Sequence, residues 1–172
     1  MSRTGFVFSC SAAAQGERIR MAMERAARAA GDMLLAAAQK GTAVHQKDGI
    51  GNFVTDCDQA VQRFLQKELK AVLPDAAFVG EEDGQDAYCA QGACFIVDPI
   101  DGTANFIRSL GCSVVSIALV EDGGARIGVV CNPFSGELFS AERGRGASLN
   151  GRPIHVSRRT LQSALVSSGM TS

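Results

Sequence analysis

The sequence predicts an α+β fold, in which two helices pack on one face of a largely antiparallel sheet. Residues before Pro74 repeat apolar side chains at a helical period, whereas the residues after it form short apolar runs of strand length. The turn signals Asp122-Gly123-Gly124 and Asn150-Gly151 then join neighbouring runs as hairpins. Two helices followed by a meander of strands are typical of a helical layer on an antiparallel sheet.

The first helix is expected over 17–40, where Gly41 ends it, and the second over 58–72, where Leu73-Pro74 stops it. The stretch 1–14 is too weak for a secretory signal and is expected to be a ragged terminus. The apolar faces predicted to meet the sheet are Ile19, Met23, Ala26, Ala27, Ala30, Met33 and Leu34 in the first helix, and Val61, Phe64, Leu65, Leu69 and Val72 in the second.

Six strands are expected, over 77–80, 94–97, 113–120, 126–131, 137–141 and 147–149. The run from Val114 to Val120 is almost continuously apolar, which is typical of a strand buried on both faces, yet two helices can cover only one. The stretch 165–172 has the pattern of a further strand just beginning. We therefore expect one domain over 1–172, with one sheet face still to be covered.

Composition favours a cytoplasmic globular protein. The net charge of -1 gives no reason to expect nucleic acid or a membrane surface as a partner, and no apolar run approaches the ~20 residues of a membrane span. The six cysteines lack CxxC spacing, so we expect small, reduced core residues and neither a zinc site nor a redox motif. His45 and His155 lie in polar stretches and are not expected to act in catalysis.

The most specific motif is the run Asp98–Phe106, with the sequence Asp-Pro-Ile-Asp-Gly-Thr-Ala-Asn-Phe. A proline lacks an N–H group, so we expect the preceding strand to stop pairing there and to leave Asp98 and Asp101 at its end. Carboxylates in such a place suit a hard cation such as Mg2+. If 103–108 form a short helix, the N–H groups of Gly102 and Thr103 favour an anion. The plainer alternative is a strand followed by an Asp-Gly turn.

Glu81 follows another short apolar strand, in the sequence Gly-Glu-Glu-Asp. Three acids in a loop are usually a solvated turn. If the two strands are neighbours, however, Glu81 and Asp98 lie side by side, and a cation between them relieves their repulsion. These carboxylates beside an anion site suggest chemistry on a phosphate ester.

A third candidate segment runs from Lys47 to Asp58. Its glycines predict a loop, and Thr55 or Asp56 is a suitable N-cap for the second helix. From the residues alone, the loop and its cap are the preferred interpretation for Thr55 and Asp56.

These motifs resemble those of the inositol monophosphatase family, a group of Mg2+-dependent, lithium-sensitive sugar phosphatases. The resemblance rests on the Asp-Pro-Ile-Asp-Gly-Thr-x-Asn-Phe run, on Gly-Glu-Glu, and on a lysine followed by Val-Thr-x-x-Asp. It covers nearly all of the chain but only the first part of a family member. The family fold is an αβαβα sandwich, so the resemblance implies its first αβ part. A Trp-Asp-x-Ala-Ala-Gly motif that completes one metal site in relatives is absent from this sequence.

The resemblance implies a role for each matching residue. Glu81, Asp98 and the carbonyl of Ile100 hold one Mg2+, while Asp98 and Asp101 share a second. Thr103 helps Glu81 to orient the attacking water, and the N–H groups of Gly102 and Thr103 bind phosphate. Asp58 belongs to the metal surroundings, Lys47 faces the catalytic side, and Glu82 is a weaker candidate. The residues with an implied role are Lys47, Asp58, Glu81, Glu82, Asp98, Ile100, Asp101, Gly102 and Thr103.

By resemblance, the expected reaction is Mg2+-dependent hydrolysis of a phosphate monoester, with inositol monophosphate favoured by the sequence Ala104-Asn105-Phe106. Other sugar or nucleotide phosphates remain alternatives, and a chain of this extent is expected to be poorly active by itself. A further alternative is a non-catalytic relative that binds metal or a partner protein. Full-length relatives commonly dimerise, and we expect a homodimer here.

Overall fold

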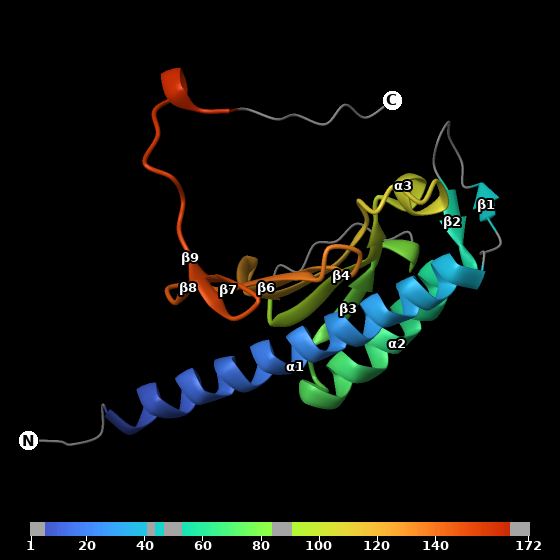
Figure 1. The fold of residues 1–172 in the computed structure, drawn as a ribbon. Helices are drawn as coiled ribbons and strands as arrows, with labels where there is room; N and C mark the ends of the chain where they lie inside the picture. The colour runs from blue at the N-terminus through green and yellow to red at the C-terminus, as the bar shows by residue number, and fades with distance from the viewer. Residues whose placement is uncertain (1–5, 41–43, 47–52, 84–90, 166–172) are drawn as a thin grey trace, which may run out of the picture.

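The computed structural model describes residues 6–40, 44–46, 53–83 and 91–165. Its main sheet has seven strands in the order β3-β4-β5-β6-β7-β8-β9, and the helices α1 and α2 lie along one face of that sheet (Figure 1). The sheet strands are β3 (Ala77–Gly80), β4 (Ala93–Asp101), β5 (Val114–Glu121), β6 (Gly124–Asn132), β7 (Glu137–Glu142), β8 (Gly146–Leu149) and β9 (Arg152–Ile154). The predicted α+β class is confirmed.

The two long helices are α1 (Phe6–Lys40) and α2 (Asp56–Val72). The start predicted for α1 at residue 17 is wrong, because the helix continues back through the strong helix formers Ala12-Ala13-Ala14. The predicted faces are confirmed: their members are buried or packed against the core. Together with Phe95, Ile117 and Leu119 from the sheet, they form one core between the helices and the strands.

Most strand boundaries differ from the predicted ones by at most two residues. The sequence patterns missed β9, and they missed a separate hairpin of β1 (Val44–Gln46) with β2 (Phe53–Thr55), which lies where a loop was expected. Both predicted turns join antiparallel strands. Asp122 and Gly123 have φ values of 48° and 74°, which is the positive pair that a tight hairpin turn requires.

The strand β4 continues through the proline, so the prediction that pairing ends at Asp98 is wrong. Asp98 pairs with Ser116 and Asp101 with Val114, which leaves one extra residue on β4 and forms a bulge. The bulge takes Pro99 out of the regular ladder with β5, and the pairing of β4 with β3 ends at Val97, so the strand accommodates a proline at this position.

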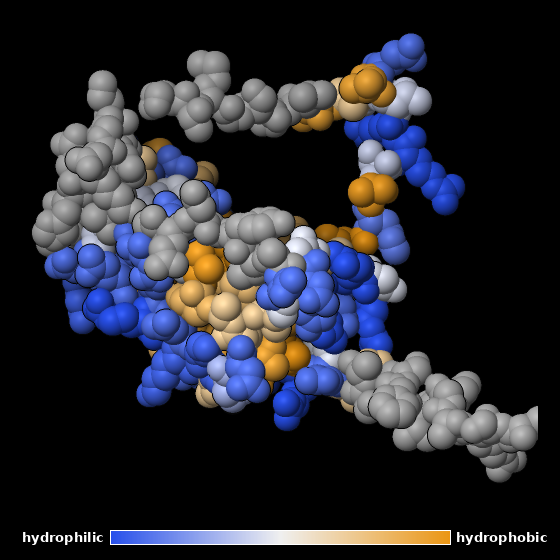
Figure 2. Space-filling view, turned by 180° about the vertical axis from the view of Figure 1, so that it is seen from behind, coloured by the Kyte–Doolittle hydropathy of each residue, from blue (hydrophilic) through white to orange (hydrophobic). Residues whose placement is uncertain are grey.

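The second face of the sheet is only half covered in the described residues. Along β5, Val115, Ile117 and Leu119 face the core, whereas the alternating residues Val114 and Val120 are half-buried, which agrees with the expectation that the two helices cover only one face of the sheet. Seen from behind, hydrophobic residues gather in the middle of the molecule and hydrophilic ones surround them (Figure 2). Beyond β9, residues 155–165 form an arm that stands away from the body (Figures 1 and 2).

The cysteines at the described positions 57, 94, 112 and 131 are either free or disulfide-bonded. Cys57 and Cys131 are free and buried, as expected of core residues, and Cys112 is free and exposed. Cys94 is disulfide-bonded, so the expectation of reduced cysteines is wrong at that position. A disulfide depends on how closely the fold brings two Cα atoms together, and this cannot be read from sequence spacing. No helix in the described part of the chain is long and apolar enough to span a bilayer.

Candidate active site

The carboxylates of Glu81 and Asp98 lie together at one edge of the sheet. The strands β3 and β4 are parallel, with Gly80 opposite Val97, so their carboxyl ends meet at the same edge. Glu81 is the first residue of the short helix η1 (Glu81–Asp83), which directly follows β3. Its carboxylate lies close enough to that of Asp98 to raise the pKa of Asp98. This pair is the centre of the candidate site.

The surroundings of Asp98 disfavour its negative charge. Burial is the largest cause, followed by the hydrogen bond and charge of Glu81 and then by the charge of Asp101; together these raise the pKa of Asp98 from 3.8 to about 8. The N–H group of Ile100 donates to Asp98 Oδ1 at 3.1 Å and opposes the rise. In the described part of the chain, no arginine or lysine forms an ion pair with these carboxylates.

The bulge in β4 determines how its two carboxylates are presented. Asp98 is half-buried and Ile100 is buried, whereas Asp101 at the strand end is exposed. The extra residue lies between Asp98 and Asp101 and changes the alternation of the strand, so the two side chains can approach one region. The repulsive effect of Asp101 on Asp98 shows that their carboxylates are close.

Asp58 connects the start of α2 to this strand end. Its Oδ2 accepts hydrogen bonds from the backbone N–H group of Thr55 at 2.7 Å and from the Thr55 hydroxyl at 2.6 Å, completing a capping box. Its Oδ1 lies 3.3 Å from the hydroxyl of Thr103, which is also 2.9 Å from the carbonyl oxygen of Ile100. Asp58 is 1% exposed, so it is both a helix cap and a buried partner of Thr103.

Gly102 provides the turn from β4 into the short helix α3 (Thr103–Ile107). Its φ of 85° is left-handed, and a Cβ atom there would lie 3.1 Å from the carbonyl oxygen of Cys112. A side chain would therefore be strained at this position. The Gly102 carbonyl accepts from the Ser113 hydroxyl at 2.9 Å and from the N–H groups of Asn105 and Phe106, which fixes α3 against the start of β5.

The structure thus brings together Asp58, Glu81, Asp98, Ile100, Asp101, Gly102 and Thr103 from three segments of the chain. Lys47 lies outside the described residues. Across the part of the chain that the structure describes, no three acidic, histidine or cysteine side chains form a ready-made metal cage. Glu81 and Asp98 instead lie side by side, and their mutual repulsion disfavours a negative charge on Asp98.

Sequence reasoning did not find the contacts of Gln62 with Glu82 and Asp83. The side chain of Gln62 is hydrogen-bonded to the Asp83 carboxylate and to the backbone of Glu82, at the turn that carries Glu81. One signal was available, because Gln62 lies four residues after Asp58 and therefore on the same face of α2.

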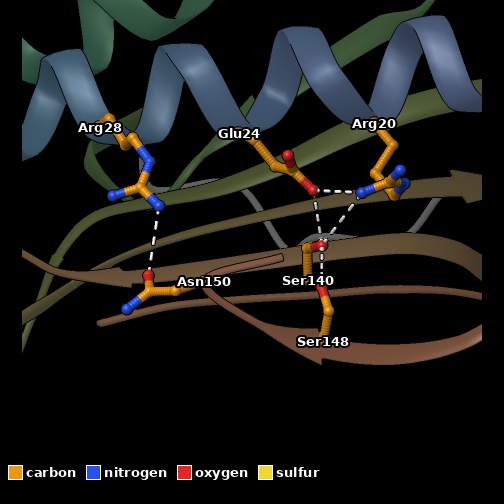
Figure 3. Close-up of polar contacts among 6 residues, drawn as sticks. All are labelled: Arg20, Glu24, Arg28, Ser140, Ser148 and Asn150. Carbon is orange, nitrogen blue, oxygen red and sulfur yellow. Dashed lines mark hydrogen bonds and ion pairs between the residues drawn. The ribbon is translucent and has the colours of Figure 1, made fainter. Parts of the chain in front are cut away.

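A second polar cluster lies elsewhere in the molecule, between α1 and the strands β7 and β8. Arg20 and Glu24 point from α1 toward Ser140 and Ser148, and Arg28 reaches Asn150 (Figure 3). A cavity of about 590 Å³ adjoins this cluster and contains none of the predicted site residues. Because the charges here are paired, this cluster has the character of a structural contact.

Comparison with known proteins identifies the family. The profile of the inositol monophosphatase family matches residues 15–172, and the chain belongs to that family. A protein named Nus factor SuhB from Xylella fastidiosa is 38% identical over 152 residues, which cover 87% of this chain and 54% of the relative. An inositol-1-monophosphatase from Synechocystis sp. is 40% identical over 114 residues, or 66% of this chain and 40% of the relative.

Solved structures agree with this assignment. The inositol monophosphatase of Thermotoga maritima superposes with a TM-score of 0.71 at 34% identity, over 78% of this chain and 52% of that one. The extragenic suppressor protein SuhB of Bartonella henselae has the same TM-score at 36% identity, over 80% of this chain and 54% of that one. The chain therefore spans about half the length of the relatives that it matches.

Proposed function

We propose that this chain supplies the main carboxylate ligands of a Mg2+-dependent phosphatase that hydrolyses inositol monophosphate. The observation that carries the proposal is the gathering of Glu81, Asp98 and Asp101 without a paired arginine or lysine among the described residues. Family membership supports hydrolysis of a phosphate monoester, and relatives named inositol-1-monophosphatase support the substrate.

The donor set fits Mg2+. Carboxylate and carbonyl oxygens are the ligands that hard divalent cations take in proteins, and Glu81, Asp98, Asp101 and the carbonyl of Ile100 provide only oxygen. A cation held between Glu81 and Asp98 would relieve the repulsion between these carboxylates. Bound Mg2+ would supply charge stabilisation to the phosphate group and lower the pKa of the attacking water.

The remaining residues would position the reactants. The hydroxyl of Thr103 lies between the Asp58 carboxylate and the Ile100 carbonyl, so it can donate a hydrogen bond to either oxygen. When Thr103 donates to Asp58, a lone pair of its own oxygen stays available to accept from the attacking water, which the Glu81 carboxylate would orient from the other side. The N–H groups of Gly102 and Thr103, at the start of α3, would bind the phosphate oxygens. Lys47 would face the same side.

The direct test is phosphate release from inositol 1-phosphate, measured with and without Mg2+ for this chain and for a version extended with the following segment of a relative. We expect release by the extended form, and an Asp98→Asn change should lower it by at least about a hundredfold. The matched control is Asp75→Asn, which alters an exposed aspartate in the turn after α2. Equal rates of Mg2+-dependent release by the extended form and by its Asp98→Asn and Asp75→Asn variants would overturn the proposal.

A second candidate function is a non-catalytic one, in which this fold binds a partner protein. It is favoured by the similarity to proteins named Nus factor SuhB. Mg2+ binding without phosphate release, even in the extended form, would support it over the phosphatase. In either case we propose a homodimer, which the half-exposed apolar face of the sheet supports and which light scattering on the purified chain would test.

A further inference from the structure

The turn that carries Glu81 is fixed by a buried side chain from α2. Gln62 is 7% exposed, and its Nε2 donates to Asp83 Oδ1 at 2.9 Å while its Oε1 accepts from the backbone N–H group of Glu82 at 3.0 Å. The N–H group of Gly80 donates to the other oxygen of Asp83 at 3.4 Å. Gln62 and Asp83 thereby contact the backbone on both sides of Glu81.

Gly80 leaves the space that this arrangement needs. A Cβ atom at Gly80 would lie 2.2 Å from Cδ and Oε1 of Gln62, closer than any non-bonded contact allows. The amide of Gln62 therefore lies directly against the last residue of β3, one position before Glu81. A movement of this turn that took the Glu81 side chain away from Asp98 would break the hydrogen bonds of the Gly80 and Glu82 N–H groups, which flank Glu81.

The same helix also holds the other half of the candidate site. Asp58 and Gln62 are one helical turn apart on α2, and both are buried. Asp58 contacts Thr103 on the strand-end side, and Gln62 contacts the turn of Glu81. The first two turns of α2 thus touch both segments that must be aligned for the site to form.

We propose that Gln62, with Asp83, is a positioning residue that holds Glu81 toward Asp98 in the binding of a divalent cation. The inference rests on the proposed function, since it concerns the same site. Neither residue needs to touch the cation. Residues that orient metal ligands in this way typically cost about tenfold or more in metal affinity when they are removed.

The test compares Mg2+ affinity by calorimetry on the full chain for Gln62→Ala, Gln62→Glu, Asp83→Asn and the double swap Gln62→Glu/Asp83→Asn. We expect each single change to weaken binding about tenfold. In the double swap, the amide introduced at position 83 can donate to the carboxylate introduced at position 62. That carboxylate still accepts from the Glu82 N–H group, so binding should return to within about twofold of the original.

Charge alone predicts a different result. Gln62→Glu adds a negative charge near the site and should tighten cation binding, whereas Asp83→Asn removes one and should weaken it. The double swap keeps the total charge of the original chain. Tighter binding in Gln62→Glu, or a double swap no better than the single changes, would overturn the positioning role.

A separate readout distinguishes this inference from the proposed function. Hydrogen exchange of the Glu82 amide needs no metal, and we expect it to accelerate in Gln62→Ala and to be slow again in the double swap. Unchanged exchange in Gln62→Ala would overturn the inference whatever Mg2+ does. If exchange behaves as expected but Asp98→Asn leaves Mg2+ binding unaltered, the proposed metal site fails, and so does the role of Gln62 in cation binding.

Discussion

Two polar clusters in this molecule are built from similar side chains but differ in charge balance. Between α1 and the strands β7 and β8, the Glu24 carboxylate is paired with Arg20 and accepts from the Ser140 hydroxyl at 2.6 Å. At the ends of β3 and β4, Glu81 and Asp98 face one another, and no arginine or lysine in the described residues pairs with them. The carboxylate of the first cluster is neutralised, whereas the carboxylates of the second have no ion-pair partner among the described residues.

This difference separates a structural role from a functional one. A carboxylate that is neutralised and hydrogen-bonded within the protein stabilises the fold and has little left to offer a ligand. Like charges held together cost free energy and persist where the fold over-determines them, which is common in sites that bind cations or substrates. The comparison predicts that the same chemical change has opposite consequences in the two clusters.

The largest expected effect concerns Mg2+ and the change of a carboxylate to an amide. At a Mg2+ concentration 100 times the Kd, binding should stabilise the original chain by about 2.7 kcal/mol. Asp98→Asn should abolish this gain, because it removes a proposed ligand, whereas Glu24→Gln should leave it intact. Thermal unfolding with and without Mg2+ measures both. Equal Mg2+ shifts in the original chain and in Asp98→Asn would contradict the contrast.

The next effect concerns stability without Mg2+. Glu24→Ala removes the acceptor of the Ser140 hydroxyl, which is 4% exposed, and removes the ion-pair partner of Arg20. The expected cost is about 1–2 kcal/mol in the free energy of unfolding, since Ser140 can still pair with Ser148 at 3.2 Å. Urea unfolding in EDTA measures it. Asp98→Asn under the same conditions at pH 8 should be neutral or stabilising, and a larger loss there than in Glu24→Ala would reverse the comparison.

A smaller effect is expected in the pH dependence of stability in EDTA. Because the pKa of Asp98 rises from 3.8 to about 8 on folding, the folded state binds more protons than the unfolded state between these values. Stability contributed by this group is therefore present at low pH and is lost as the pH rises toward 8. Asp98 is only half-buried, so solvent screening reduces the size of the effect. The measurement is the urea midpoint of unfolding as a function of pH between about 4 and 8. If the midpoint changes with pH equally in the original chain and in Asp98→Asn, another group causes the pH dependence.

The fold was largely predictable from the sequence because its signals are local. The apolar period of α2 and the turn residues Asp122 and Gly123 specify their elements without reference to distant parts of the chain. The bulge at Pro99 was missed for the opposite reason. Whether a proline ends a strand or is accommodated depends on the neighbouring strand β5, whose register a local pattern does not contain.

The residues of the candidate site also divide into those that a local sequence pattern indicates and those that depend on tertiary packing. Glu81 and Asp98 were singled out because a strand followed by a carboxylate is a local pattern, and Thr103 because it belongs to the motif that resembles that of the family. Gln62 was missed because its importance arises only where α2 packs against η1, and its position on the same helix face as Asp58 does not by itself reveal that contact. The disulfide of Cys94 depends equally on tertiary structure.

The smallest expected effect concerns the exposed end of the polar cluster between α1 and the strands β7 and β8. Arg28 donates to the Asn150 side chain at 3.2 Å on the surface, where water competes for the same groups (Figure 3). Arg28→Ala should therefore cost less than about 0.5 kcal/mol. Asn150→Ala should cost more, because Asn150 also accepts from the Leu138 N–H group at 3.0 Å, donates to the Gly136 carbonyl at 3.1 Å and has a positive φ of 50°.

Urea unfolding of both variants checks this order of the two costs. A cost for Arg28→Ala as large as that for Glu24→Ala would mean that exposed contacts hold α1 on the sheet as firmly as half-buried ones. The contrast between the two clusters would then no longer follow from burial and charge balance.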